Sequence, residues 1–279
     1  MVDRIDVRNL CGAEAHMVVD WARREGWNPG LHDAACFYAA DPEGFLVSLH
    51  DGEPAAVISV VRYDASYAFL GLYICRPELR GQGYGMRVWK AGIEHAGGRT
   101  IGLDGVPDQQ ENYARSGFRL AWRNRRYQGV GGGERDPGLV DLDEIAFGRI
   151  TAFDYDVFEA DRRRFLRFWV AQPDAVRLAS VRGEQLTGWG MMRRCVDGHK
   201  IGPLLAEDIA TAERLLDGLL AEVPGETVYL DVPEPNHAAV RAAEARGMTV
   251  SFETARMYAG TPPDLNLAKI WGITTFELG

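Results

Sequence analysis

The sequence has few cysteines, no long apolar run and no spacing typical of metal ligands. Its four cysteines form no C-x-x-C pair and its six histidines show no ligand spacing, so we expect reduced thiols and no metal. Nowhere do about 18 consecutive apolar residues occur. Residues 1–6 carry acidic side chains and lack the apolar core of a signal peptide. These absences disfavour disulfide-stapled and membrane-spanning classes and predict a cytoplasmic protein.

The bulk composition is that of a globular protein large enough for two domains. The chain has 279 residues, of which 46% are hydrophobic and 25% charged, and this length is about twice a typical domain. A formal net charge of −9 disfavours a general nucleic-acid binder and mildly favours cationic small molecules. We therefore expect neither nucleic acid nor membrane as a partner, and nothing in the sequence bears on the oligomeric state.

A glycine-rich loop follows an apolar run at 68–75. Arg80-Gly81-Gln82-Gly83-Tyr84-Gly85 lies between this predicted strand and a predicted helix, an arrangement that presents free backbone N–H groups to a pyrophosphate. A P-loop would need Lys-Ser or Lys-Thr after its last glycine, but Met86-Arg87 follows. A dinucleotide fingerprint needs G-x-G-x-x-G, which the glycines at 81, 83 and 85 do not form. Both of these loop types are thus excluded.

A second motif lies about 30 residues downstream. A short strand at 100–103 and a turn at 104–107 precede a helix at 108–116, which Gly117 ends before a further strand at 118–127. The Arg-x-x-Gly-x-Gly loop followed by Tyr-x-x-x-Gly-Phe at 113–118 resembles the core of the GCN5-related N-acetyltransferases (GNATs). The resemblance implies acetyl-CoA as co-substrate and direct attack of an amine on its thioester.

The resemblance also assigns the cofactor-binding residues. It implies that the loop backbone cradles the pyrophosphate, and that the end of the preceding strand bonds the pantetheine amides and points a backbone N–H at the acetyl oxygen, where it stabilises an oxyanion. The residues so implicated are Ile74, Cys75, Arg80, Gly81, Gln82, Gly83, Tyr84, Gly85 and Met86. The alternatives are a glycine-rich turn that only caps a helix, and, for Cys75, either packing or a nucleophile that carries the acetyl group.

Tyr113 is the predicted general acid, because in the family a tyrosine at this place protonates the departing thiolate. A phenol with a pKa near 10 is protonated at working pH; the alternative is a core tyrosine with a satisfied hydroxyl. Many family members carry a glutamate base on the strand before the loop, but Gly71 stands there and the strand has no carboxylate. Asp104 is the best replacement by position, followed by Asp33, Asp108 and Glu111. A water chain could serve as the base instead. The alternative role for Asp104 is to shape the Asp-Gly turn.

The pattern of strands and helices repeats in the second half of the chain. Aligning Gly247 on Gly117 gives an offset of 247 − 117 = 130 residues, which predicts a tandem duplication. This offset puts 210–215, without glycine, in place of the loop and Ala243 in place of Tyr113. The second copy is therefore expected to bind no CoA. Arginines at 123–126 and 162–167 are interpreted as solvent-facing.

The predicted fold class is α/β, with two tandem GNAT-like domains. Each is expected to be a mostly antiparallel twisted sheet with one splayed pair of parallel strands and flanking helices. The predicted boundaries are 1–130 for a catalytic domain and 139–279 for a degenerate one, joined by a glycine-rich linker at about 129–138. Segments 102–107, 158–162 and 271–279 resemble a bacterial subgroup of the YitH kind.

The predicted function is acetyl transfer from acetyl-CoA to a small primary amine or free amino group, at one site per chain. A non-catalytic CoA-binding sensor and an acetyltransferase acting on a protein amino group are the alternatives. Acyl groups longer than acetyl are also compatible with the motifs, and the sequence does not identify the acceptor.

Overall fold

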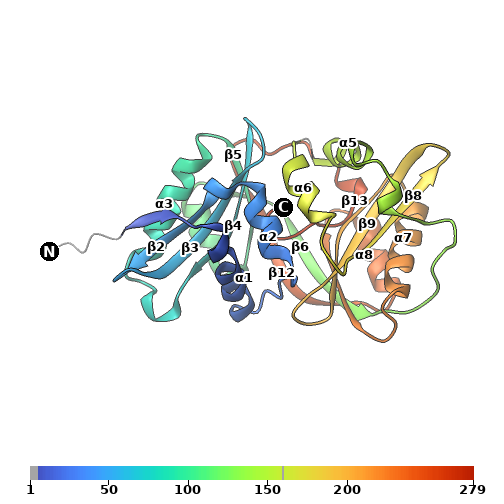
Figure 1. Cartoon of the computed structure of the whole chain (residues 1–279), viewed down its shortest axis with the longest axis horizontal. Helices are drawn as coiled ribbons and strands as arrows, with labels where there is room; N and C mark the ends of the chain where they lie inside the picture. The colour runs from blue at the N-terminus through green and yellow to red at the C-terminus, as the bar shows by residue number, and fades with distance from the viewer. Residues whose placement is uncertain (1–5, 159) are drawn as a thin grey trace.

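The computed structural model describes residues 6–158 and 160–279. Residues 1–5, part of the stretch expected to lack a signal peptide, lie outside the described residues, as does Glu159 of the 158–162 segment. Figure 1 shows the first half of the chain beside the second, with the end of the chain between them. In the described ranges, one sheet of thirteen strands runs through both halves. Within these ranges, too, no helix has the length and apolarity needed to cross a membrane.

The strands predicted at 68–75, 100–103 and 118–127 and the helix predicted at 108–116 are present, with ends within a few residues of expectation. The elements of the first half are β1 (Val7–Asn9), α1 (Ala15–Arg24), α2 (Asp33–Ala40), β2 (Phe45–His50), β3 (Glu53–Arg62), β4 (Tyr67–Cys75), α3 (Tyr84–Ala96), β5 (Thr100–Gly105), α4 (Gln110–Arg115) and β6 (Arg119–Val130). Helix α2 was not predicted, because it is buried on several sides, at Ala34, Cys36, Phe37 and Ala40. It therefore lacks the apolar period of a surface helix.

The second half repeats this order. Its elements are β7 (Val140–Asp141), α5 (Phe147–Phe158), α6 (Arg163–Trp169), β8 (Val176–Arg182), β9 (Gln185–Arg194), β10 (His199–Ala206), α7 (Ile209–Ala221), β11 (Thr227–Pro233), α8 (His237–Ala245), β12 (Thr249–Ala259) and β13 (Ile270–Gly272). Strands β8 to β12 and helices α7 and α8 match β2 to β6 and α3 and α4 in sequence order. The mixed sheet and its duplicated α/β pattern agree with the predicted fold class.

The two halves exchange strands β6 and β12. β12 pairs antiparallel with β5, with Arg256 opposite Asp104, while β6 pairs antiparallel with β11, with Tyr127 opposite Leu230. β6 and β12 also pair with each other at the centre of the sheet. The boundaries at 130 and 139 therefore follow the sequence repeat. The part of the sheet that belongs to each half, however, is completed by a strand of the other half. Residues 131–139 carry the chain between β6 and β7.

Each half contains a splayed pair of parallel strands, but the two splays differ. β4 and β5 pair from Tyr67 to Leu70 and then separate; Leu72, just beyond, has a φ of 49°. β10 and β11 pair from His199 to Ile201, and beyond that point β13 pairs with β10. The N–H of Ile273 then donates to the carbonyl of Asp231, at 2.8 Å. β13 thus fills the splay of the second half, and the first splay keeps an opening.

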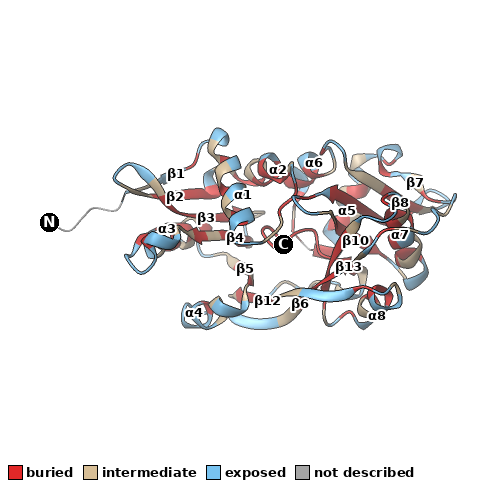
Figure 2. Cartoon of the chain, turned by 90° about the horizontal axis from the view of Figure 1, so that it is seen from below, coloured by how far each residue is buried: buried red, intermediate tan, exposed pale blue. Residues whose placement is uncertain are grey.

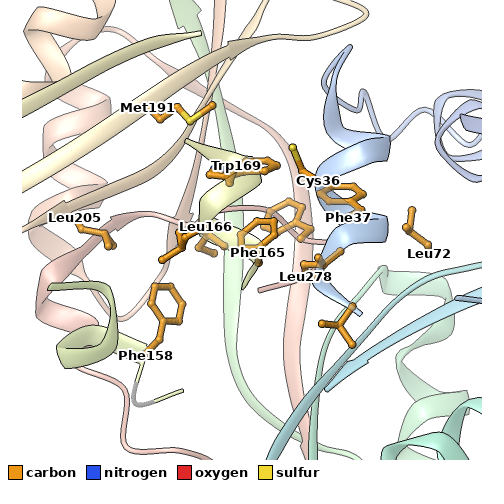
Figure 3. Close-up of a cluster of buried hydrophobic side chains, with 14 of the residues drawn as sticks. Cys36, Phe37, Leu72, Phe158, Phe165, Leu166, Trp169, Met191, Leu205 and Leu278 are labelled. Atoms are coloured by element: carbon orange, nitrogen blue, oxygen red, sulfur yellow. The ribbon is translucent and has the colours of Figure 1, made fainter. Parts of the chain in front are cut away.

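The largest hydrophobic cluster belongs to both halves. Phe37 of α2 stacks on Trp169 of α6, with ring centroids 6.0 Å apart and an interplanar angle of 8°, and Phe165 and Leu278 lie in the same cluster (Figure 3). Figure 2 shows buried segments in the middle of the molecule, where α2 and α6 meet, and exposed ones along α4. Because both rings are fully buried, the cluster holds the halves together.

Candidate active site

A cavity of about 840 Å³ opens at the splay between β4 and β5. Its walls come from the end of β4, the glycine-rich loop, the segment from β5 to α4, and the second half of the chain. The lining residues include Glu25, Trp27, Gly71, Ile74, Cys75, Arg80, Gly81, Gly83, Gly85, Met86, Trp89, Asp104, Asp108, Tyr113, Arg126, Phe252, Phe276 and Glu277. The structure therefore brings the predicted loop and Tyr113 to one cavity, and adds a wall that the sequence did not indicate.

The loop ends at an uncapped helix N-terminus. Gly81 and Gly83 have φ values of 76° and 94°, a region that glycine adopts without strain. Gly83 is the N-cap of α3, and no side chain caps this helix. The first N–H groups of a helix have no acceptor within it, so the amides of Tyr84, Gly85 and Met86 can meet an anion. This observation fits a pyrophosphate at the loop.

The side chains of the loop take separate roles. Arg80 donates to the Glu25 carboxylate at 2.5 Å and to the Cys75 carbonyl at 3.1 Å. Gln82 donates to a backbone carbonyl at 3.0 Å, and the Tyr84 hydroxyl lies 2.5 Å from His50 Nδ1. Neither Gln82 nor Tyr84 lines the cavity. Their contribution to a ligand would therefore come from the backbone.

Ile74 and Cys75 both line the cavity at the end of β4. Burial raises the pKa of the Cys75 thiol, which disfavours the thiolate that a nucleophilic role requires. All four cysteines are free thiols. The geometry thus favours the expected backbone contact over acetyl transfer through Cys75.

Tyr113 is buried but its hydroxyl is free. Its ring stacks on Trp89 at 5.7 Å, and a Cβ at Gly105 would lie 2.9 Å from the tyrosine ring. No hydrogen bond joins the hydroxyl to any residue that the structure describes, and Tyr113 lines the cavity. Burial raises the pKa of this phenol. A fixed, protonated and unpartnered hydroxyl at a cavity wall suits a general acid better than a satisfied core tyrosine.

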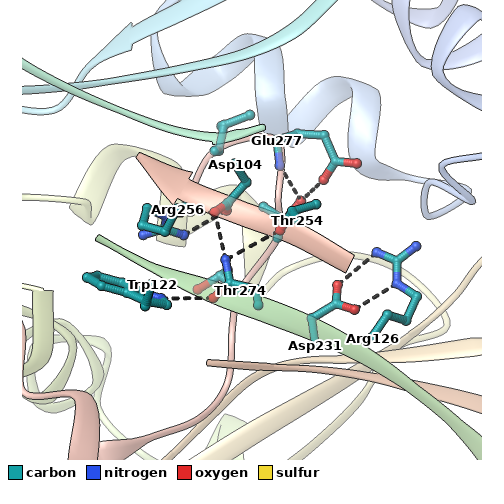
Figure 4. Close-up of polar contacts among 12 residues, drawn as sticks. Asp104, Trp122, Arg126, Asp231, Thr254, Arg256, Thr274 and Glu277 are labelled. Atoms are coloured by element: carbon teal, nitrogen blue, oxygen red, sulfur yellow. Dashed lines mark hydrogen bonds and ion pairs between the residues drawn. The ribbon is translucent and has the colours of Figure 1, made fainter. Parts of the chain in front are cut away.

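Asp104 is held in an ion pair. Both carboxylate oxygens accept from Arg256, at 2.8 and 2.7 Å, and Oδ1 also accepts from Asn124 at 2.7 Å (Figure 4). The side chain is fully buried, and burial raises its pKa. Because both oxygens are occupied by a cation and an amide, these contacts favour a structural role for Asp104 over the expected role of base.

The other carboxylates expected near the site are separated. Asp33 is buried and accepts from Arg193 at 2.9 Å, and Asp108 is exposed at the cavity rim. Glu111 does not line the cavity and pairs with Arg115, which does. Glu277, by contrast, is buried and lines the cavity. Sequence reasoning missed Glu277, because Gly71, against which it packs, lies in the other half of the chain.

The described residues of the second half lack both parts of this site. Two residues, 207 and 208, separate β10 from α7, compared with eight residues, 76–83, between β4 and α3. The 210–215 segment therefore lies inside α7 and is not the counterpart of the loop, which corrects the alignment by a fixed offset. Asp208 caps α7 by accepting from the Thr211 N–H at 2.8 Å, which puts a carboxylate where an anion would bind. Ala243 is buried in α8.

Comparisons with known proteins identify relatives of both halves. Residues 14–118 match the family model described as acetyltransferase (GNAT) family, and residues 150–272 match the model described as acetyltransferase (GNAT) domain. A protein named holothin acyltransferase, from Pseudoalteromonas sp. (strain SANK 73390), is 33% identical over 269 residues, which cover 95% of this chain and 92% of that protein.

Solved structures share the architecture. A putative acetyltransferase from Pyrococcus horikoshii aligns with a TM-score of 0.85 at 20% identity, covering 100% of this chain and 97% of that chain. A tandem GNAT protein from the clavulanic acid biosynthesis pathway aligns with a TM-score of 0.65 at 14% identity, covering 94% and 100%. These likenesses show the fold. The family models and the acyltransferase relative establish that the chain belongs to the GNAT acetyltransferase family and is an acyltransferase with two GNAT domains.

Proposed function

We propose that this protein transfers an acetyl group from acetyl-CoA to a small primary amine, at one active site in the first half of the chain. The observation that carries this proposal is the cavity at the β4–β5 splay, because the uncapped N-terminus of α3 and the unpartnered hydroxyl of Tyr113 open onto the same space. The second half has neither feature and its splay is filled by β13.

The residues of the first half divide the chemistry among them. The amides from Gly81 to Met86 hold the pyrophosphate, and the strand end at Ile74 and Cys75 offers backbone groups to the pantetheine arm. A backbone N–H there polarises the thioester carbonyl. The neutral amine attacks the carbonyl carbon, the C–N bond forms and the C–S bond breaks. Tyr113 gives its proton to the departing sulfur.

The far wall of the cavity supports a small, partly apolar acceptor. Trp27, Phe252 and Phe276 bring three aromatic side chains to it, and aromatic walls favour flat or apolar ligands. The relative at 33% identity is named an acyltransferase of holothin. We therefore favour a compact amine over a protein amino group as the acceptor. Acyl groups longer than acetyl are compatible with the cavity volume.

Two further proposals rest on the sequence. The segment 102–107 supports membership of the YitH-type subgroup, and the free thiols of all four cysteines support a cytoplasmic location. The function needs no metal. A CoA-binding sensor is the second candidate, since the loop alone would bind acetyl-CoA without turnover.

Calorimetry with acetyl-CoA and an assay of CoA thiol release over a panel of primary amines test the proposal together. We expect one acetyl-CoA per chain and thiol release that depends on the amine. Tight binding without release on any amine would favour the sensor. Two acetyl-CoA molecules per chain would contradict the assignment of a single site.

A further inference from the structure

The acceptor amine needs a carboxylate that β4 does not provide. A primary aliphatic amine has a pKa near 10.4 and reaches the site as an ammonium ion, whose lone pair is unavailable until a proton leaves. Strand β4 contains no acidic residue. Among the described residues, four carboxylates line the cavity: Glu25, Asp104, Asp108 and Glu277.

Three of these carboxylates are unsuited to the task. Glu25 is paired with Arg80 at 2.5 Å, and Asp104 is paired with Arg256 through both of its oxygens. Asp108 is exposed in the turn before α4, at the cavity rim. Contacts and exposure leave Glu277 as the carboxylate that is enclosed and free of a cation.

Glu277 reaches the site from the other half of the chain. After β13 fills the second splay, the 273–279 segment continues to the first splay and packs against β4. A Cβ on Gly71 would lie 2.0 Å from the Glu277 carbonyl oxygen and 3.1 Å from its Cα. Glu277 therefore stands beside the point where β4 and β5 separate, which is where the cavity begins.

No cation among the described residues pairs with the Glu277 carboxylate. The Glu277 side chain accepts a hydrogen bond from the Thr275 hydroxyl, and no ion pair involving it occurs among the described residues. In Figure 4 its carboxylate points away from the Asp104–Arg256 pair. Burying a carboxylate without a cation costs several kcal/mol, so a cationic ligand at this place would relieve the cost.

The charged groups whose fields reach Glu277 come from four strands. They are Asp104 on β5, Arg126 on β6, Arg193 on β9 and Lys200 on β10. Arg126 is bound to Asp231 and Arg193 to Asp33, and the Lys200 ammonium donates to the Asn28 carbonyl at 2.9 Å. Arg126, Arg193 and Lys200 thus make the surroundings of Glu277 polar, but each is bound to another partner and none forms an ion pair with Glu277.

We infer that Glu277 is a catalytic residue, which binds the acceptor ammonium and takes its proton. This inference rests on the proposed acetyl transfer. The ammonium gives one proton to the carboxylate and becomes a neutral amine, which forms the C–N bond as the C–S bond breaks. The proton that Tyr113 gives to sulfur is replaced by the second proton lost from nitrogen. Glu277 then returns its proton to solvent, so the reaction releases one proton overall.

The test compares Glu277→Gln with the wild type in the full chain. At pH 7 we expect kcat/KM for an aliphatic amine to fall by about 10²- to 10⁴-fold, with acetyl-CoA affinity in calorimetry unchanged. The loss should shrink by at least about tenfold as pH rises toward the pKa of the amine, or when an aromatic amine, neutral at pH 7, is the acceptor. Glu184→Gln, at an exposed position in the turn between β8 and β9, is the matched control and should behave as the wild type.

Several outcomes would overturn the inference. If Glu277→Gln keeps the wild-type rate, or loses the same factor at every pH and with both kinds of amine, Glu277 is not the base. A loss in Asp108→Asn but not in Glu277→Gln would move the role to Asp108. If Glu277→Gln does not fold by circular dichroism, Glu277→Asp takes its place, with a reduced rate and the wild-type pH dependence expected. A wild type that releases no thiol with any amine overturns the proposed function itself, and this role with it.

Discussion

The carbonyl oxygen of Glu277 occupies the space into which a side chain at Gly71 would project. A Cβ built on Gly71 lies 2.0 Å from that oxygen and 2.8 Å from the carbonyl carbon. Residue 71 can therefore carry no side chain while the 273–279 segment is in place. A single methyl group at this position is thus a probe of whether the segment belongs to the working site.

Gly71→Ala should displace the segment. We expect a loss of about 1–3 kcal/mol of unfolding free energy, as for other overpacked core positions, and a lower acetylation rate with intact binding of acetyl-CoA. Urea unfolding and calorimetry measure both effects. Gly148→Ala is the control, because nothing lies within 4 Å of a Cβ there and alanine favours the helix by about 1 kcal/mol. Equal behaviour of the two variants would contradict the packing.

Gly83→Glu should abolish the anion site. The new carboxylate lies at the N-cap of α3, where it repels a pyrophosphate, and the φ of 94° strains any residue other than glycine. We expect affinity for acetyl-CoA to fall more than about tenfold, or 1.4 kcal/mol. Ile209→Glu places the same charge at the start of α7, where Ile209 is exposed, and should leave the affinity unchanged. Weakening by both variants would locate the ligand elsewhere.

Tyr113→Phe should slow the chemical step while leaving acetyl-CoA bound. Removing the acid lowers kcat by about 10²- to 10⁴-fold. Since burial raises the pKa of Tyr113, its proton stays in place as the assay becomes alkaline, and the wild-type rate should show no loss from this group up to pH 10. Tyr155→Phe, at an exposed position, is the control. A variant as fast as the wild type at neutral and at high pH would show that another group protonates the thiolate.

Asp104 and Arg256 should matter as a pair. Asp104→Asn leaves a buried guanidinium without its counter-ion, a loss of about 3–5 kcal/mol. The double variant Asp104→Leu with Arg256→Met removes both charges and should recover most of that stability, as thermal unfolding would show. If Asp104 is structural, the double variant still acetylates amines. A well-folded double variant without activity would restore Asp104 as the base.

The exchange of strands should make each half depend on the other. Residues 1–138 produced alone lack β12 beside β5, so we expect a poorly folded fragment that binds no acetyl-CoA. Co-production with 139–279 should restore binding, because both sheets then find their exchanged strands. Gel filtration and calorimetry distinguish the cases. Wild-type affinity in the isolated first fragment would show that the exchange is dispensable for the site.

The glycine-rich loop and the helix that carries Tyr113 could be predicted because their structure depends on short-range rules. Glycine at 81, 83 and 85 sets the backbone, and the helix that follows sets the amides, all within a few residues. The alternation of apolar and polar side chains along β6 and β12 indicates which face of each strand is buried. It carries no information about the neighbouring strand, so the exchange was not predicted.

The charged residues were predicted less well for a related reason. Arg126 and Arg162 were interpreted as solvent-facing, but both are buried, with Asp231 and Asp154 as partners. The Arg126–Asp231 pair spans 105 residues of sequence, and a local pattern cannot reveal it. Arginine is buried only where such a partner exists, so its placement depends on tertiary structure. The position of Glu277, beside Gly71 of the first half, also depends on tertiary structure.

The exchanged strands also bear on how the two copies can differ. A symmetric dimer of single-half subunits could place the last strand of each in the sheet of its partner, and there every substitution would occur on both sides of the axis. Joining the copies through 131–139 removes that constraint. One copy can then give up its anion-binding loop and accept β13 in its splay, while the other keeps the chemistry. Asymmetry between duplicated units thus lets one of them become part of the substrate pocket of the other.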